Sequence, residues 1–268
     1  MARYIPYRST TPGRGTVMAA SILITGASSG IGAALARAYA APGVQLSLWG
    51  RNAERLAKIA EDCRGRGASV SAIAWDFRDI AGLASRIEAL DSERAIELAI
   101  FCAGVGGAIP PGRIVETPEQ TRDVAMVNFS AATIAATAMA NRMVERRRGH
   151  IVLIGSLAES FPFPIAPTYA ATKAGLRTFA EALGIAVDIR DVAVTLVSPG
   201  FVDTPMSGLL TGPKPLMITA EAAATIIRRG VERRARRVVF PWRLALLRRL
   251  FLCLPRPLRH AIMRRIKA

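Results

Sequence analysis

The sequence contains little cysteine. Its 268 residues include three, Cys63, Cys102 and Cys253, which are scattered and form no Cys-x-x-Cys pair. An odd number of cysteines at such spacings predicts neither a disulfide framework nor a zinc site, and we expect no metal site. This cysteine usage suits the reducing cytoplasm.

The first 20 residues lack the apolar core of a signal peptide. We interpret residues 1–19 as a flexible leader, with Met18 as an alternative start of the native chain. Long hydrophobic runs are also scarce: the uncharged, helix-like run over residues 124–141 has eighteen residues, the lower limit for a membrane span. This run is dominated by alanine and contains Asn128, which favours a buried, closely packed helix over the membrane-spanning alternative.

Acidic residues are nearly absent from the C-terminal end. Residues 226–268 carry 14 basic side chains and one acid, Glu232, whereas residues 21–225 carry 19 of each sign. The net charge of +16 therefore belongs mainly to a tail. With 51% hydrophobic residues the chain is too apolar for disorder, and its length suits one large domain.

Strand and helix patterns alternate from residue 20 onward. This alternation, with near-continuous apolar strands, predicts an α/β fold: one doubly wound parallel sheet of the Rossmann type, covered by helices on both faces. We expect a catalytic domain over residues 20–240, with a substrate lid at about 203–220, and a basic, partly amphipathic helical tail over 241–268. The expected strands are 21–25, 44–49, 69–75, 97–102, 151–156 and 193–198, and the expected helices are 31–41, 53–64, 80–90, 118–146 and 168–185.

A glycine-rich turn follows the first expected strand. It reads Thr25-Gly26-Ala27-Ser28-Ser29-Gly30-Ile31-Gly32 and opens a helix. Backbone N–H groups at such a helix start, aided by the helix dipole, bind the pyrophosphate of a dinucleotide. We therefore predict a dinucleotide site, with a glycine turn that binds no ligand as the alternative.

The second expected strand lacks the acid that usually binds the ribose of NAD. Such an Asp or Glu lies about twenty residues beyond the glycine motif, but here no acid follows the strand until Glu54. Arg51 offers a guanidinium suited to a 2′-phosphate instead. NADP(H) is therefore favoured over NAD(H), unless Arg51 is only a solvated residue at a helix start.

Ser156, Tyr169 and Lys173 have a spacing typical of proton transfer. If residues 168–185 are helical, Tyr169 and Lys173 lie at i and i+4 and share a face. A nearby ammonium favours the phenolate, so we expect the pKa of Tyr169 to be lowered. Such a tyrosine exchanges protons with an alcohol or a carbonyl near neutral pH. An ordinary strand-end serine and an ordinary helix pair are the alternative.

With these motifs the chain resembles the classical short-chain dehydrogenases/reductases, the SDR family, over about residues 20–205. The family usually has asparagine at the position of Cys102, so its replacement puts local stability in question more than the chemistry. We interpret Cys102 as a small buried residue and not as a redox group. The matching motifs are the glycine turn, Asp76, Cys102-Ala103-Gly104, Asn128, Ser156, Tyr169-x-x-x-Lys173, and Ser198-Pro199-Gly200 running to Thr204.

The resemblance implies a role for each matching residue. Tyr169 would be the general acid in reduction and the base in oxidation, and Ser156 would hold the substrate oxygen against it. Lys173 would bind the nicotinamide ribose and lower the pKa of Tyr169, and Asn128 would hold a water that connects Lys173 to solvent. Asp76 would contact the adenine. The residues expected to contact the cofactor are Gly26, Ser28, Ser29, Gly30, Ile31, Gly32, Arg51, Asp76, Phe77, Cys102, Ala103, Gly104, Tyr169, Lys173, Pro199, Gly200, Val202 and Thr204.

Apolar segments flank this expected site. Residues 161–167 are stiff and apolar, and residues 206–217 are an apolar loop whose glycines and prolines can act as hinges. In related enzymes the latter region is the lid over the substrate. Both segments suggest an apolar carbonyl or alcohol as the substrate.

The tail alternates arginines with large apolar residues. On a helical wheel Leu247, Leu250, Phe251 and Leu254 cluster, with arginines opposite. Such a helix is suited to an anionic membrane surface, but packing of the tail on the body or on a partner subunit explains the pattern equally well. Nucleic-acid binding is a third alternative, disfavoured because no recognition fold accompanies the charge.

The sequence thus predicts an NADPH-dependent oxidoreductase that reduces a hydrophobic ketone, or oxidises the matching secondary alcohol, with Tyr169 as general acid/base. An NAD-dependent alcohol dehydrogenase of the same fold and a non-catalytic NADP-binding sensor or tethering protein are the alternatives. A complete set of Asn128, Ser156, Tyr169 and Lys173 argues against the sensor. The resemblance also implies a homodimer or homotetramer. We expect a cytoplasmic protein, associated with the cytoplasmic face of a membrane if the tail binds lipid.

Overall fold

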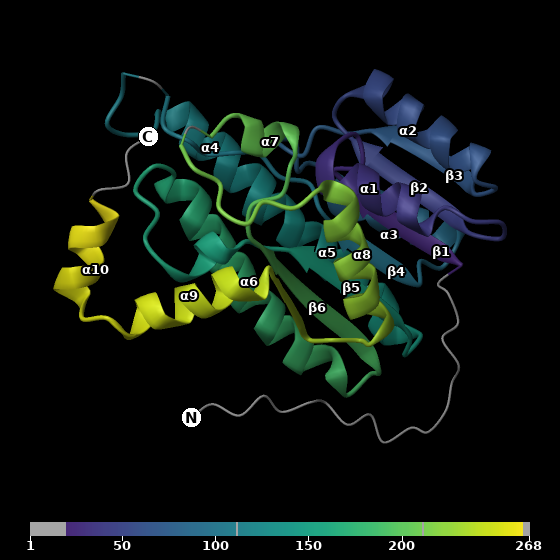
Figure 1. The fold of residues 1–268 in the computed structure, drawn as a ribbon. Coiled ribbons are helices and arrows are strands. Elements are labelled where there is room, and N and C mark those ends of the chain that lie inside the picture. Colours follow the sequence, from purple (N-terminus) through teal and green to yellow (C-terminus); the bar gives the residue numbers. More distant parts are fainter. Residues whose placement is uncertain (1–19, 111, 211, 265–268) are drawn as a thin grey trace.

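The computed structural model describes residues 20–110, 112–210 and 212–264, so the expected leader 1–19 lies outside the described residues. Its centre is a seven-stranded parallel sheet in the order β3-β2-β1-β4-β5-β6-β7 (Figure 1). The predicted doubly wound fold is confirmed. The strands are β1 (Ser21–Thr25), β2 (Gln45–Gly50), β3 (Ser69–Ala74), β4 (Leu98–Phe101), β5 (Gly149–Ile154), β6 (Val192–Pro199) and β7 (Arg237–Phe240).

Helices cover both faces of the sheet, and a separate apolar cluster fills each interface. Strands β1 and β5 are buried along their whole length, which explains their continuous apolar sequence. One face packs against α1 (Gly30–Tyr39), α2 (Ala53–Gly65) and α8 (Ala220–Glu232), and the other against α3 (Leu83–Glu93), α5 (Ala132–Glu145) and α6 (Pro167–Asp188).

The long helix predicted over 118–146 is present, but its middle turn is not α-helical. It consists of α4 (Pro118–Ala125), a π-helical turn η1 (Met126–Ala131) and α5. Its length and composition would allow it to cross a membrane, yet 56% of an 18-residue window is buried inside the protein. The helix packs against α3, α6 and β5, in agreement with our interpretation of a buried helix.

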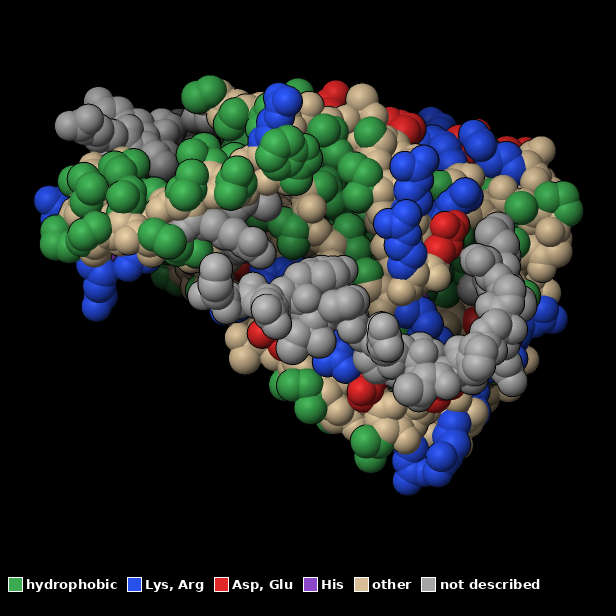
Figure 2. All heavy atoms as spheres, turned by 60° about the horizontal axis from the view of Figure 1, so that its bottom comes forward, with side chains coloured by type: hydrophobic (Ala, Val, Ile, Leu, Met, Phe, Trp, Pro, Cys, Tyr) green, Lys and Arg blue, Asp and Glu red, His purple; other side chains and the backbone are tan. Residues whose placement is uncertain are grey.

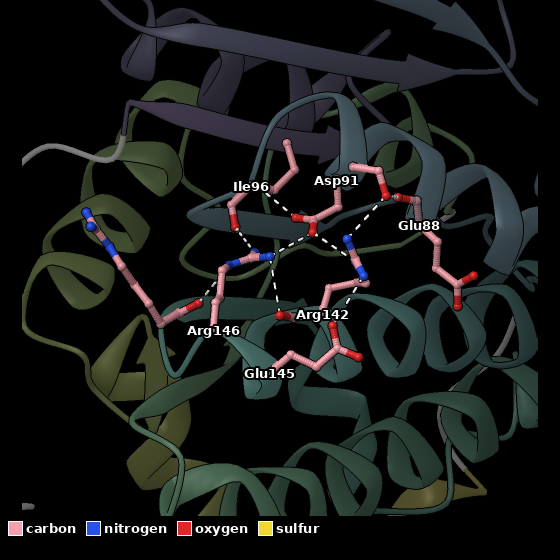
Figure 3. A network of polar contacts seen from close by, with 8 residues as sticks. Glu88, Asp91, Ile96, Arg142, Glu145 and Arg146 are labelled. Carbon is pink, nitrogen blue, oxygen red and sulfur yellow. Dashed lines mark hydrogen bonds and ion pairs between the residues drawn. The ribbon is translucent and has the colours of Figure 1, made fainter.

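A buried carboxylate joins α3 to the end of α5, as Figure 3 shows. The side chain of Asp91 is 1% exposed and accepts a hydrogen bond from the backbone N–H of Ile96 at 2.9 Å. Arg142 and Arg146 donate to the same carboxylate at 3.2 and 2.7 Å. Because every partner lies on a different turn or element, this network fixes the packing of the helix pair beside the sheet.

Two C-terminal elements, helix α8 and strand β7, complete the sheet layer and were not predicted. The helices α9 (Trp242–Cys253) and α10 (Arg256–Met263) follow, within the tail that we predicted as helical. Figure 1 shows these two helices as an arm beyond the end of β7. Short helical turns, η2 (Leu157–Ser160) and α7 (Pro205–Gly208), follow β5 and β6 at the carboxyl edge of the sheet, which is where ligands bind in such folds.

Candidate active site

The glycine turn after β1 leaves no room for larger residues. Gly26 has φ +68°, and a Cβ there would lie 2.8 Å from the Cα of Ala103. A Cβ on Gly32 would lie 2.3 Å from the carbonyl oxygen of Gly26. The N-cap residue of α1, Ser29, makes no side-chain capping hydrogen bond, so the first N–H groups of the helix are available to a ligand. The turn therefore fits the pyrophosphate of a dinucleotide.

Thr25 ties the ends of β1 and β4 together. Its hydroxyl oxygen accepts hydrogen bonds from the backbone N–H groups of Cys102 and Ala103 at 3.0 and 3.1 Å. A hydrogen-bonded tie between the two strands is thus present although Cys102 replaces the usual asparagine. Burial raises the pKa of the Cys102 thiol to about 12, so the thiol is protonated at neutral pH.

Two arginines lie where the adenosine end of a dinucleotide would bind. Arg51 lines the cavity as predicted, and Arg55, which we missed, lines it one helical turn later. The i, i+4 spacing of the two arginines could have indicated that Arg55 lies beside Arg51. Asn52 caps α2 by accepting a hydrogen bond from the N–H of Arg55 at 2.7 Å. The nearest acid, Glu54, is exposed and paired with Lys58 at 2.8 Å.

Asp76 and Phe77 line the same end of the cavity. The carboxylate of Asp76 accepts hydrogen bonds from the backbone N–H and the guanidinium of Arg78, both at about 3 Å. These hydrogen bonds hold the pKa of Asp76 below its usual value. Asp76 is therefore an ionised acceptor with a fixed orientation, and its contact with the adenine stays a prediction.

The predicted catalytic side chains converge at the ends of β5 and α6. Ser156 follows β5, and its hydroxyl oxygen accepts a hydrogen bond from the N–H of Ala158 at 3.1 Å. The side chain of Ser156 lies close enough to Tyr169 to lower the pKa of its phenol. The ammonium of Lys173 lies 5.6 Å from the centroid of the Tyr169 ring and donates to the carbonyl oxygen of Ile154 at 2.8 Å. The arrangement joins a hydroxyl, a phenol and the buried ammonium of Lys173 in one cluster on the cavity wall.

The pKa of Tyr169 differs from our expectation of a lowered value. Burial raises it above the reference value, the hydrogen bond with Ser156 lowers it, and the charge of Glu159 raises it. Burial also lowers the pKa of Lys173 to about 8. Both shifts have the same cause, because removal from water penalises the phenolate and the ammonium alike. Tyr169 thus holds its proton at neutral pH.

Asn128 lies in the π-helical turn and is 1% exposed. Its amide makes a reciprocal pair of hydrogen bonds with the backbone of Val105, accepting from the N–H at 2.8 Å and donating to the carbonyl oxygen at 2.9 Å. The side chain therefore fixes the segment that follows Gly104. The role of Asn128 in holding a water stays a prediction. The structure shows a further role, in which Asn128 positions the backbone of Val105.

One cavity of about 1100 Å³ brings nearly all the predicted site residues together. Gly32 and Asn128 do not line the cavity, but each packs against residues that do. The predicted residues on its surface are Gly26, Ser28, Ser29, Gly30, Ile31, Arg51, Asp76, Phe77, Cys102, Ala103, Gly104, Ser156, Tyr169, Lys173, Pro199, Gly200, Val202 and Thr204.

The substrate end of the cavity is apolar. Phe161 and Phe163 line it from the segment after η2, and the expected lid contributes residues near α7. Leu216 and Met217 of the expected lid are exposed and do not line it. Further apolar residues of this wall are Met206, Leu209, Leu210, Leu244, Leu247, Leu250, Phe251, Leu254, Ile262 and Met263.

The tail is therefore part of the site, which we did not predict. The four residues that cluster on the helical wheel of 247–254 all line the cavity. The rings of Phe161 and Phe251 make an edge contact, with centroids 6.1 Å apart, and Leu244 packs against Gly200, where a Cβ would lie 2.9 Å from its Cδ2. In this structure α9 packs on the body, as one of our three interpretations required.

Comparison with known proteins agrees with the geometry of the site. The sequence profile of the short chain dehydrogenases matches residues 20–213. An uncharacterized oxidoreductase from Myxococcus xanthus is 34% identical over 246 residues, 91% of this chain and 96% of the relative. Dehydrogenase/reductase SDR family member 7B from Bos taurus is 33% identical over 204 residues, 72% of this chain and 61% of the relative.

A solved structure shares both the fold and the length of the chain. The short-chain dehydrogenase from Sphingobium yanoikuyae in complex with NADPH superimposes with a TM-score of 0.78 and 28% sequence identity, over 92% of this chain and 96% of that protein. The glycine turn, the Ser156–Tyr169–Lys173 cluster and the profile match all describe the same class of enzyme. The chain belongs to the short-chain dehydrogenases/reductases and is an NAD(P)-dependent oxidoreductase.

Proposed function

We propose that this enzyme uses NADPH to reduce a hydrophobic ketone to a secondary alcohol, or catalyses the reverse oxidation. The observation that carries the proposal is that a protonated Tyr169 and an apolar wall line the same cavity. Tyr169 keeps its proton because burial raises its pKa, and the residues around the substrate end are almost all hydrocarbon. A buried proton donor beside an apolar wall suits a carbonyl oxygen on an apolar substrate.

Tyr169 would donate its proton to the carbonyl oxygen during reduction. When bound, the nicotinamide coenzyme supplies the hydride to the carbonyl carbon. Ser156 would donate a hydrogen bond to the same oxygen and hold it beside the phenol. Lys173, whose ammonium is fixed by the carbonyl oxygen of Ile154, would bind the ribose and stabilise the phenolate left after proton transfer. In alcohol oxidation the proton moves in the opposite direction.

The preference for NADPH rests on Arg51 and Arg55. Both guanidinium groups line the adenosine end of the cavity, while the carboxylate of Glu54 is paired with Lys58. A hydrogen bond to a charged group contributes about 1.5–3 kcal/mol. Arg51→Ala or Arg55→Ala should therefore raise KM for NADPH about tenfold or more, with little change for NADH. Equal losses with the two coenzymes would contradict the preference.

The decisive experiment follows NADPH consumption against ketones graded by apolar bulk. The rate should rise with bulk until the cavity is filled. Tyr169→Phe is the matched control, because it removes one hydroxyl and keeps the ring. It should abolish turnover while NADPH still binds. No turnover of any ketone or of the matching alcohols, despite tight NADPH binding, would overturn the proposal in favour of a non-catalytic NADP-binding protein.

We also infer a cytoplasmic enzyme whose arm of α9 and α10 contacts an anionic membrane. Figure 2 shows hydrophobic side chains gathered on this arm, with basic side chains at its lower edge. Trp242 is 67% exposed, and Leu246 is also exposed. Neither residue lines the cavity, so both are free to contact another surface. Among the described residues, Arg243, Arg256 and Arg264 form no ion pair. Apolar side chains beside unpaired cations favour an anionic lipid surface.

Vesicle sedimentation tests this contact. The protein should bind vesicles that contain phosphatidylglycerol, bind less at high salt, and not bind pure phosphatidylcholine. Trp242→Ser with Leu246→Ser should release it from the vesicles and keep its ketone reduction in solution, because neither residue lines the cavity. Absence of binding to the anionic vesicles would contradict the membrane contact.

We further infer a homodimer or homotetramer, as is general in this family. Phe129 of the π-helical turn is 37% exposed and packs on Gly175 of α6, where a Cβ would lie 3.0 Å from its ring. A partly exposed aromatic ring that packs on a glycine of the neighbouring helix suits helix packing between subunits. Light scattering should report a mass above 28.6 kDa, and Phe129→Asp should shift it towards the monomer.

A further inference from the structure

Glu159 is a buried carboxylate that the proposed proton transfer does not use. It lies in η2, three residues after Ser156, and is 4% exposed. A carboxylate is rarely buried unless a cation and hydrogen bonds compensate for the loss of water. Both compensations are present here, and both come from segments far away in the sequence.

Two strands supply the partners of Glu159. The hydroxyl of Ser198, in β6, donates to both carboxylate oxygens, at 3.0 and 3.1 Å. The guanidinium of Arg237, in β7, forms an ion pair with the same carboxylate. A Cβ on Gly155 would lie 2.9 Å from Oε2 of Glu159, so the backbone before Ser156 also packs directly against this carboxylate.

These contacts connect the two segments that must meet at the reacting atoms. Ser156 and Glu159 lie in the turn after β5, on the substrate side. Ser198 immediately precedes Pro199 and Gly200, which line the cofactor side of the cavity. The backbone pairing of β5 with β6 ends at the hydrogen bond from the N–H of Gly155 to the carbonyl oxygen of Val197, at 2.7 Å. Beyond that point the carboxylate of Glu159 ties the turn of the substrate-binding serine to the segment expected beside the nicotinamide.

We propose that Glu159 is a positioning residue of this enzyme, which holds the Ser156 turn against the end of β6 and places a fixed negative charge behind Tyr169. The proposal rests on the proposed reductase function. Removal of Glu159 should lower kcat more than it changes KM, because the geometry of the reacting groups is lost and the apolar wall that binds the substrate is kept.

The charge of Glu159 also acts on the neighbouring catalytic groups. It raises the pKa of Tyr169 and of Lys173. The other charged or titratable groups that face this cluster are Cys102, beside Lys173, and Arg237, which also lies 3.8 Å from Glu181 of α6. Loss of the negative charge leaves Arg237 with only the half-exposed Glu181 as an acidic partner among the described residues, so both changes lower the pKa of Tyr169.

Glu159→Gln tests the proposal, because the amide keeps the shape and can accept a hydrogen bond from Ser198. Ketone reduction needs protonated Tyr169, so its rate falls as pH rises through the pKa of the tyrosine. In the variant this basic limb should move to lower pH by about half a unit or more, and kcat should fall about tenfold. Glu181→Gln is the matched control: it also removes a carboxylate partner of Arg237, but one that is half exposed and outside the cavity. Its basic limb should coincide with that of the wild type.

A purely structural role for Glu159 predicts a lower melting temperature with an unchanged basic limb and an unchanged kcat at full occupancy, and this result would overturn the proposal. If Glu159→Gln does not fold, Ser198→Ala removes the tie and leaves the carboxylate in place. This variant should lower kcat about tenfold and leave the Kd for NADPH unchanged. An unchanged kcat would also overturn the proposal. If instead the wild-type protein reduces no ketone, the proposed function has failed and not the assignment of Glu159.

Discussion

The imidazole of His150 should make the stability of this enzyme depend on pH in a predictable way. His150 lies at the start of β5 and is 7% exposed. Its Nε2 lies 2.8 Å from the hydroxyl oxygen of Thr195 in β6, and that hydroxyl donates to the carbonyl oxygen of Ala235 at 2.6 Å. Thr195 therefore accepts a hydrogen bond from a protonated Nε2. Burial lowers the pKa of His150 to about 3, so the folded protein holds a neutral imidazole.

The size of the effect follows from this pKa. An unfolded histidine titrates near 6.5, so the unfolded state takes up a proton first as the pH falls. The stabilisation from neutral His150 is therefore fully present above about pH 6.5 and is lost progressively towards pH 3. The limiting slope is about 1.4 kcal/mol per pH unit. Between pH 7 and pH 5 the loss amounts to about 2 kcal/mol.

Urea unfolding of the wild type and of His150→Gln at the two pH values measures this loss. Glutamine keeps an N–H donor for Thr195 but does not titrate, and all other titrating groups are common to the two proteins. The wild type should lose about 2 kcal/mol more of its free energy of unfolding than the variant. If both proteins lose the same amount, His150 is not held neutral in the β5–β6 pair and the reasoning is refuted.

Three other substitutions and one labelling experiment test further parts of the structure. Asp91→Ala should lower the free energy of unfolding by about 2–3 kcal/mol in urea, since the N–H of Ile96 and two partly exposed arginines lose a buried acceptor; a loss below about 1 kcal/mol would contradict the network. Gly32→Ala should prevent NADPH binding, measured by fluorescence, because its Cβ would lie 2.3 Å from a backbone oxygen; circular dichroism separates this from unfolding. Timed mass spectrometry should show that a thiol reagent modifies exposed Cys253 long before the half-buried Cys102, whose pKa is about 12; equal rates would contradict this raised pKa. Phe251→Ala should raise KM for a bulky apolar ketone about tenfold and leave KM for NADPH unchanged, and parallel changes in both would place Phe251 outside the substrate wall.

The sequence was sufficient for the features that local patterns encode. Strands buried on both faces must be continuously apolar, so β1 and β5 could be recognised without any knowledge of their neighbours. The glycine turn could be recognised for a similar reason: the chain approaches its own backbone so closely that a Cβ on Gly32 would lie 2.3 Å from the carbonyl oxygen of Gly26. The i, i+4 relation of Tyr169 and Lys173 follows from helix geometry alone.

Properties that depend on surroundings could not be read in this way. We expected Lys173 to lower the pKa of Tyr169, but burial of both groups outweighs their proximity, and burial depends on every segment that encloses them. Arg237 and Glu159 form their ion pair although 78 positions separate them, and no local pattern indicates this pairing.

The tail illustrates the same division. Its helical wheel predicted an apolar stripe over 247–254, and those residues do lie together. A stripe records that apolar atoms avoid water without recording what covers them, so membrane, body and partner subunit were equivalent alternatives. Only the path of the chain from β7 past Gly200 brings α9 against Phe161 and makes the stripe a wall of the substrate cavity. Periodicity reports which side chains share one face of a helix, and the long-range packing of the chain decides what that face meets.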